Sequence, residues 1–235
     1  MTDAGKLVKP ATVEAIAAYI RESAQEAFAA KVKAFNHYPG QTFTSSNWME
    51  RNSELRAYLS DAWRSADRNQ REEFVSWYIK KWGGIKRLGV QHVVAYAAGP
   101  ASIDMTDFTR IASWSKALAM MDPHQFAIYD ARVAFALNAV QAIKLGWIPT
   151  WFRIPTTQKG VVKGTHIDLE RYASPSTIVL GDADVYRAYL YALQKCATSG
   201  MEQSEMILFA LTDSLAAGIR KMPTIPRPQL SSSRR

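Results

Sequence analysis

The sequence predicts an all-α protein. Apolar residues recur at spacings of three and four positions over most of the chain, which is the period of an amphipathic helix. Short groups of Gly, Pro, Ser and Asn separate these stretches, and seven Trp, ten Tyr and nine Phe can form a large core. We therefore expect one globular helical domain over residues 1–222 and exclude disorder as the main state of the chain.

The first half of the chain is expected to hold helices at residues 11–35, 48–66, 70–82 and 91–98. The break at residues 37–40 ends the first helix, and the polar residues 44–47 offer N-caps to the second. Asn69 can cap the third helix, whose C-terminus falls at the glycine pair 83–84. A Gly-Pro pair at residues 99–100 closes the fourth helix.

The second half is expected to hold helices at residues 104–121, 130–145, 183–198 and 202–220. The Asp-Pro pair at residues 122–123 stops the first of these helices, and Asp130 is placed to cap the next. Residues 150–180 carry several glycines and prolines with few periodic apolar positions, which predicts a long loop or a short hairpin. Residues 223–235 are expected to form an extended or frayed tail.

Composition excludes several classes of protein. No stretch approaches the ~18 uninterrupted apolar residues of a membrane span, and charged residues interrupt the first 25 positions, so we expect neither a membrane protein nor a signal peptide. The single cysteine cannot form an internal disulfide, and the four histidines are far apart in sequence. We therefore expect a cytoplasmic protein that uses no metal and no organic cofactor.

The charge of the chain points to a polyanionic partner. The net charge is +8, and residues 51–100 contribute half of the excess, with nine basic and five acidic residues. The densest part of this segment has Lys80, Lys81, Lys86 and Arg87 around Trp82 and two glycines, a composition that suits contacts with a phosphate backbone. The alternative is a solvated helix end whose charge serves only solubility.

Lys116 and Asp130 are the strongest candidates for a chemical site. Ser113 or Ser115 can cap a helix that carries Lys116 near its N-terminus, and Asp130 caps the next helix. From Lys116 the first helix advances only about 8 Å, and the eight residues that follow it can span up to about 26 Å. The chain can therefore return and place the amine and the carboxylate together.

That pairing has a chemical rationale. The positive end of a helix dipole disfavours the ammonium form of a lysine, and a neutral, desolvated amine is a nucleophile that can form a Schiff base. A nearby carboxylate can accept protons or stabilise a developing cation, and helix N-termini can bind a phosphate. The alternative is that Lys116 is a surface residue and Asp130 is only a helix cap.

These motifs resemble the helix-hairpin-helix DNA glycosylase superfamily, and most of all its 8-oxoguanine-glycosylase-like branch. The similar segments are Ser115-Lys116, the step Ile128-Tyr129-Asp130 before Val133, the segment Lys81-Trp82-Gly83-Gly84-Ile85 and the segment Glu205-Met206-Ile207-Leu208-Phe209. Together they span roughly residues 70–215. Residues 111–115 stand where many members have a glycine hairpin, and the fourteen positions from lysine to aspartate are fewer than is usual.

The resemblance implies two helical lobes with a cleft between them. It also implies that Lys116 attacks the sugar C1′ and that Asp130 assists. Such an enzyme must flip a nucleotide out of the duplex and hold its base, which is why aromatic and polar residues near the motifs are candidates for a base pocket. These candidates are Trp114, Tyr129, Trp82, Gln91 and His92, although each large ring can equally belong to the core and the Gln-His pair can be structural.

Further candidates for contacts with the DNA backbone lie outside the basic segment. They are Ser113, Ser115, Arg132, Lys159 and Lys163. Arg132 can pair either with Asp130 or with a phosphate, and the two lysines flank glycines in a segment that can close over DNA or simply move.

The sequence thus predicts a monomeric DNA glycosylase that acts on double-stranded DNA containing a modified base and associates with the nucleoid. It releases the base, with β-elimination if Lys116 forms a Schiff base. The substrate is either an oxidised purine or a hypermodified phage base, such as a glucosylated one, removed in antiviral defence. The alternative from another class is a helical DNA-binding or interaction module without catalytic activity.

Overall fold

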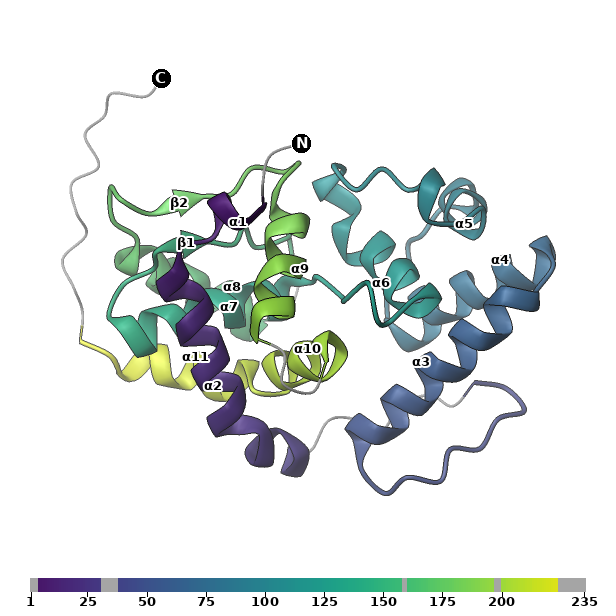
Figure 1. Ribbon diagram of the computed structural model, residues 1–235, viewed down its shortest axis with the longest axis horizontal. Coiled ribbons are helices and arrows are strands. Elements are labelled where there is room, and N and C mark those ends of the chain that lie inside the picture. The colour runs from purple at the N-terminus through teal and green to yellow at the C-terminus, as the bar shows by residue number, and fades with distance from the viewer. Residues whose placement is uncertain (1–3, 31–37, 158–159, 197–199, 224–235) are drawn as a thin grey trace.

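The computed structural model describes residues 4–30, 38–157, 160–196 and 200–223. Helices make up most of these residues, so the predicted all-α class is confirmed (Figure 1). The exceptions are β1 (Thr150–Trp151) and β2 (Ile178–Val179), which pair in parallel with Thr150 opposite Ile178. Over the described ranges, no helix combines the length and apolar character that crossing a membrane requires.

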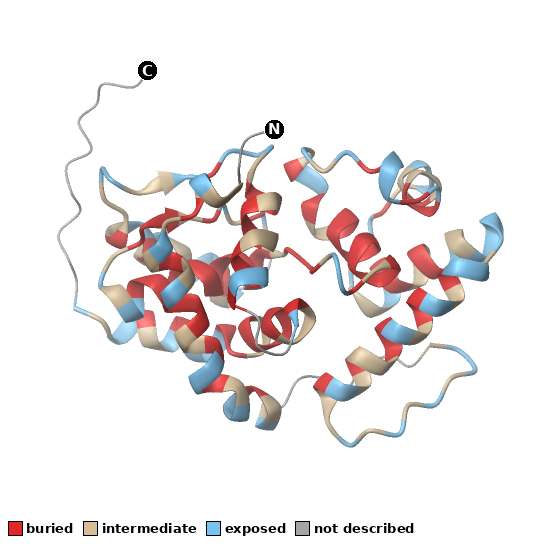
Figure 2. Cartoon of the chain, viewed as in Figure 1, coloured by how far each residue is buried: buried red, intermediate tan, exposed pale blue. Residues whose placement is uncertain are grey.

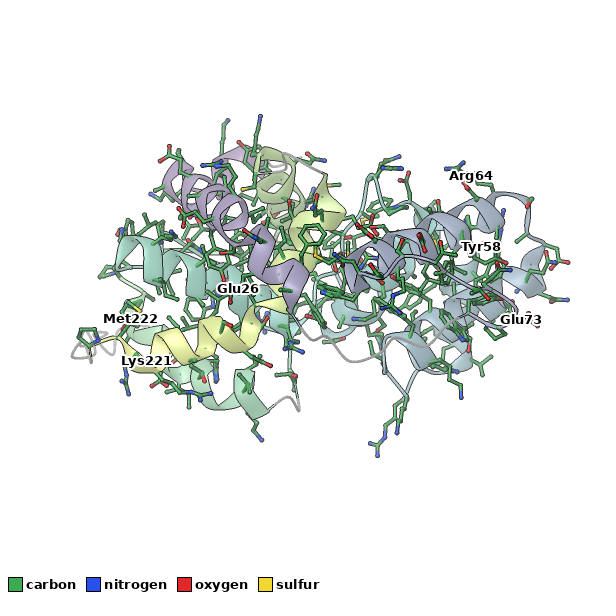
Figure 3. The ribbon with its side chains drawn as sticks, turned by 90° about the horizontal axis from the view of Figure 1, so that it is seen from below. Glu26, Tyr58, Arg64, Glu73, Lys221 and Met222 are labelled. Atoms are coloured by element: carbon green, nitrogen blue, oxygen red, sulfur yellow. The ribbon has the colours of Figure 1, made fainter. Side chains whose placement is uncertain are left out.

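The helices gather into two groups that lie side by side (Figures 1 and 3). The first group contains both strands and α1 (Ala4–Leu7), α2 (Pro10–Ala29), α7 (Ala131–Leu145), α8 (Gly160–Leu169), α9 (Val185–Cys196), α10 (Met201–Ala210) and α11 (Thr212–Lys221). The second group contains α3 (Trp48–Ser65), α4 (Arg68–Trp77), the π-helical turn η1 (Tyr78–Trp82), α5 (Val90–Ala97), the 3-10 turns η2 (Pro100–Ser102) and η3 (Phe108–Arg110), and α6 (Ile111–Met121). The described residues therefore begin and end in the first group. The cleft expected between two lobes stays a prediction.

Helix α7 lies at the centre of the first group. It packs against α2, α8, α10 and α11, and nearly all of its first twelve residues are buried (Figure 2). A helix that is apolar on all sides is expected at such a central position. The buried amide side chains of Asn138 and Gln141 form hydrogen bonds with the backbone N–H and C=O groups of Phe152 and Thr150, respectively. They thus supply bonds of the kind that a neighbouring strand would supply to β1.

In the second group α3 packs against α4 and α6, and α4 packs against α5. The predicted helix at 48–66 is confirmed by α3, which Asn47 caps. The third helix begins earlier than predicted, because Asp67 and Gln70 form a capping box and Asn69 lies inside the helix. The last turn of the predicted helix, at Tyr78–Trp82, is a π-helical turn that ends at Gly83.

Two predicted helices are shorter than expected. The helix predicted at 104–121 begins only at Ile111, because the carboxylates of Asp104 and Asp107 accept bonds from the N–H groups of Thr106 and Thr109 and hold turns instead. The helix predicted at 11–35 ends at Ala29, and residues 31–37 lie outside the described part of the chain.

The helix predicted at 202–220 is divided at Leu211 into α10 and α11. Beside this break, the hydroxyl of Thr212 donates hydrogen bonds to backbone carbonyls, including that of Leu208. Such local bonds from side chain to backbone compete with a continuous helix.

The prediction of a loop or hairpin at 150–180 is wrong. This segment holds α8 and η4 (Glu170–Tyr172) between two parallel strands, where a hairpin would make the strands antiparallel. Val162, Thr165 and Leu169 have helical spacing and are buried, but Gly160 and Gly164 weaken the helical pattern in the sequence. Of the predicted tail, only Pro223 lies within the described residues.

Candidate functional site

The structure brings Lys116 and Asp130 together where the two groups of helices meet. Lys116 lies on α6 in the second group, and Asp130 precedes α7 in the first. The lysine Nζ lies 3.7 Å from the Asp130 Oδ2, and it donates a hydrogen bond of 3.2 Å to the carbonyl of Ala112. The side chain of Lys116 is 6% exposed and that of Asp130 is 20% exposed, so little water reaches the amine.

The two oxygens of Asp130 face different partners. Oδ1 accepts hydrogen bonds from the backbone N–H groups of Arg132 at 2.9 Å and Val133 at 3.2 Å, which makes Asp130 the N-cap of α7. Oδ2 is the oxygen nearest the Lys116 amine. The helix cap therefore fixes the carboxylate at the positive end of α7 and leaves one oxygen directed to the lysine.

The predicted position of Lys116 at a helix N-terminus is wrong. Helix α6 begins at Ile111 with Arg110 at its N-cap, so Lys116 lies in the second turn. Neither Ser113 nor Ser115 caps this helix, because the Ser113 hydroxyl donates to the Arg110 carbonyl and the Ser115 hydroxyl bonds with Tyr129. At this position the positive end of the α6 dipole acts little on the amine. The polar groups nearest to it are the Ala112 carbonyl and the Asp130 carboxylate.

Gly83 forms a wall against the lysine side chain. A Cβ atom at this position would lie 2.8 Å from the Lys116 Cδ, 2.9 Å from its Cε and 2.8 Å from the Ile79 carbonyl oxygen. Gly83 has a φ of −77°, which any residue adopts, so the glycine is required by space and not by backbone conformation. The segment of residues 81–85 thus reaches Lys116 through its first glycine.

The linker between α6 and α7, residues 122–130, is held by side chains from both groups. Its residues 127–129 are buried (Figure 2). The Ser115 hydroxyl accepts from the Tyr129 N–H at 3.0 Å, and the hydroxyls of Tyr186 and Tyr189 donate to the carbonyls of Ala127 and Ile128 at 2.9 and 2.8 Å. Burial raises the pKa of both tyrosines, so their hydroxyls stay protonated and remain donors.

Two of the predicted base-pocket residues belong to the core. Trp114 is 1% exposed and donates from its indole nitrogen to the Asp107 carbonyl, and Tyr129 is fully buried and donates to the Arg153 carbonyl. Their rings pack edge-on against Tyr186 and Tyr189, respectively. We therefore withdraw both from the predicted base pocket.

The other three base-pocket candidates lie nearer the surface. Trp82 is partly exposed, stacks on Tyr78 at 4.2 Å between ring centroids, and directly precedes Gly83. Gln91 is exposed and His92 is half-buried, and both lie in the first turn of α5. Trp82 is thus the predicted aromatic residue that the chain places beside the lysine wall.

The predicted contacts with the DNA backbone divide into exposed and buried residues. The exposed ones are Lys81, Lys86, Arg87 and Lys163, and Lys80 is partly buried. Lys80 and Lys81 line an open groove of about 330 Å³ together with Tyr38 and Trp77. Lys163 lies on α8 and not on a loop, and Lys159 lies outside the described residues.

Ser113, Ser115 and Arg132 are engaged within the protein. The two serines are buried, Ser115 completely, so they cannot reach a phosphate in this arrangement. The Arg132 guanidinium pairs with Asp213 at 3.0 Å and lies over the Phe209 ring, and it does not pair with the Asp130 carboxylate. The two serines are withdrawn as contacts with DNA, and a contact of Arg132 with a phosphate stays a prediction.

Sequence reasoning missed a buried ion pair next to the linker. Arg56 of α3 donates from Nη1 and Nη2 to the two carboxylate oxygens of Glu205 on α10, at 2.8 and 3.0 Å. Burial alone would lower the pKa of Arg56, but the Glu205 carboxylate and its neighbours raise it well above its usual value. Both residues occupy apolar positions of their helices, and a charged residue at such a position was the signal available in the sequence.

In the part of the chain that the structure describes, no three His, Cys, Asp or Glu side chains are grouped so that they could hold a metal ion. Comparison with models of protein families, with curated proteins and with solved structures finds no match to this chain.

Proposed function

We propose that this protein is a DNA glycosylase that releases a modified base through Lys116 and Asp130. The observation that carries the proposal is the enclosed pair itself, an amine 3.7 Å from a carboxylate that a helix N-terminus fixes in place. The segments that resemble glycosylases also meet in space. Gly83 packs against Lys116, Lys116 meets Asp130, and the Glu205 carboxylate accepts from the N–H of Ile128.

In this mechanism the Lys116 amine attacks C1′ of a flipped nucleotide. The bond from C1′ to the base nitrogen breaks, the base leaves with the electron pair of that bond, and Asp130 accepts the proton that the amine loses. The sugar ring then opens, and O4′ takes the proton that Asp130 holds, which gives a protonated Schiff base between Nζ and C1′. The Asp130 carboxylate next accepts a proton from C2′, and the 3′ phosphate leaves with the electron pair of its bond to C3′ by β-elimination.

The partner is double-stranded DNA that the protein binds as a monomer. Its exposed basic residues Lys81, Lys86 and Arg87 lie just before and after Gly83, so the same segment supplies backbone contacts and the wall of the lysine site. The substrate is an oxidised purine or a hypermodified phage base, and a sugar-bearing base requires the wider pocket of the two.

A second candidate function is a DNA-binding or interaction module without catalytic activity. It is favoured by the 6% exposure of the Lys116 side chain, since an enclosed ion pair between two groups of helices can serve stability alone. The two functions differ in whether the amine reacts.

Borohydride trapping decides between them. The protein is incubated with duplexes that contain oxidised, unmodified or glucosylated bases, in the presence of borohydride. A covalent adduct and base release are expected with the wild-type protein on one modified duplex and are expected to disappear in Lys116→Gln.

Lys144→Gln is the matched control, because Lys144 lies on α7 and pairs with Glu22 instead of Asp130. It is expected to form the adduct at the wild-type rate. If no duplex yields an adduct or a free base with the wild-type protein, the catalytic proposal fails and the module is favoured. Base release without an adduct would indicate attack by water with Asp130 as the assisting carboxylate.

A further inference from the structure

The guanidinium of Arg56 is bonded on two sides. It makes two hydrogen bonds to Glu205, while its Nε donates to the hydroxyl of Tyr78 at 3.0 Å. Arg56 is 1% exposed and Glu205 is 3% exposed. Because α3 and α10 belong to different groups of helices, this ion pair ties the two groups together.

Each partner of Arg56 leads to one side of the lysine site. Glu205 Oε2 also accepts the N–H of Ile128 at 3.0 Å, and Ile128 lies two residues before Asp130. Tyr78 begins the π-helical turn, and its carbonyl accepts the N–H of Gly83 at 2.8 Å. Two successive hydrogen bonds therefore connect Arg56 to Gly83 through Tyr78. Two others connect it through Glu205 to the linker that precedes Asp130.

Stability gives a poor account of this arrangement. Removing two charges from water costs more than their attraction commonly returns, and apolar residues of similar size often stabilise such a position better. What apolar residues cannot do is accept the N–H of Ile128 or hold the Tyr78 hydroxyl. The directional bonds are therefore the property that the ion pair supplies.

We infer that Arg56 and Glu205 are positioning residues that hold the Asp130 carboxylate and the Gly83 wall in register on either side of Lys116. The inference rests on the proposed function for its catalytic consequence. Its structural part, the fixing of residues 127–130, is independent of that function. Neither residue touches the reacting atoms in this scheme.

The test replaces the pair with apolar residues, Arg56→Met together with Glu205→Leu, in a Glu202→Gln background. The Glu202 carboxylate lies 3.5 Å from the Arg56 Nε, so its replacement leaves no carboxylate that has lost the arginine. The control is Arg68→Met with Glu72→Leu, which removes an exposed Arg and Glu pair on α4. Three quantities are measured, namely the hydrogen exchange of residues 126–130, the dissociation constant for the substrate duplex, and the rate of base release at saturating DNA.

We expect the buried replacement to exchange faster at residues 126–130 and to bind DNA within about threefold of wild type. It should release the base about tenfold to a hundredfold more slowly, because displacement of a reacting group by about 1 Å has this effect. Glu205→Gln keeps an oxygen that can accept from Ile128 and should recover part of the protection from exchange. The control should match the wild type in all three measurements.

Unchanged exchange at residues 126–130 in a folded variant overturns the inference, and so does faster exchange with base release at the wild-type rate. If the double replacement does not fold, Arg56→Lys takes its place, since it keeps the charge and removes the two-pronged geometry. A wild-type protein that releases no base refutes the proposed function instead. Exchange then decides whether the ion pair holds the linker.

Discussion

Replacing Gly83 with alanine tests how closely the lysine is enclosed. The new Cβ would lie 2.8 Å from the Lys116 Cδ and 2.8 Å from the Ile79 carbonyl oxygen. Carbon atoms in favourable contact are about 3.5 to 4.0 Å apart, so the lysine chain must move by roughly 0.7 Å or more. The backbone at Gly83 accepts alanine without strain, and the whole cost is therefore steric.

Two opposing effects set the size of the change in stability. Overpacking of an enclosed site costs about 1 to 3 kcal/mol, whereas an alanine at a compatible backbone position stabilises by about 0.4 to 1 kcal/mol through the unfolded state. We expect Gly83→Ala to lower the free energy of unfolding by about 1 to 2 kcal/mol in urea titrations. Single-turnover base release should slow by about tenfold or more, because the amine moves relative to Asp130.

The control is Gly164→Ala within α8, where the new Cβ would meet no atom within 4 Å. It should raise the free energy of unfolding by about 0.5 to 1 kcal/mol and leave base release unchanged. In a Lys116→Ala background the clash with the lysine is gone, and the cost of Gly83→Ala should fall by at least about 0.5 kcal/mol. An equal loss of unfolding free energy in both backgrounds would refute the close contact between Gly83 and the Lys116 side chain. A Gly83→Ala protein that matches the wild type in stability and base release would refute it as well.

Three other outcomes are expected. Asp130→Asn keeps the helix cap but removes the carboxylate from the Lys116 amine, and it should lower the free energy of unfolding by about 1 to 3 kcal/mol in urea titrations. Adding Lys116→Gln should restore part of this loss, and purely additive effects of the two substitutions would contradict the ion pair. Lys86→Ala with Arg87→Ala should weaken binding to every duplex alike. It should also reduce the slope of log K against log salt by about 0.9 for each phosphate contact that is lost, and an unchanged slope would show that this segment does not contact DNA. Burial raises the pKa of the Cys196 thiol from its usual 9.0 to about 12. The neutral buried thiol therefore contributes its full stability below pH 9, and this contribution is lost as pH rises from 9 toward 12 because the thiol of the unfolded chain ionises first. Urea titrations should show a shallower decline above pH 9 for Cys196→Ala than for the wild type, and equal slopes would count against this effect.

Local patterns in the sequence determined the helical class and most helix positions. The helices at 48–66 and 130–145 are found almost at their predicted ends, because apolar spacing, an N-cap and a terminating glycine or turn all act within a few residues. The same local information placed Asp130 as a helix cap. The residues between the two helices can span enough distance for the chain to return, which was sufficient to propose that Asp130 meets Lys116.

Local patterns failed where a competing interaction came from elsewhere. Two glycines weaken the helical pattern of α8 in the sequence, so this helix was not predicted. Its packing against α7 and α11 stabilises it in the fold. Trp114 and Tyr129 suit a base pocket by composition, but a large ring fits the core equally well, and only the fold decides between these places.

The tertiary structure alone decided what surrounds the lysine. Gly83 and Lys116 are separated by a complete helix, and Arg56 meets Glu205 across 149 positions of the chain. Such contacts depend on how two groups of helices pack, because a side chain reaches only the few atoms that packing brings within bonding distance. The sequence therefore supplied the reactive pair, and the packing of α3, α6 and α10 around the linker determined how that pair is held.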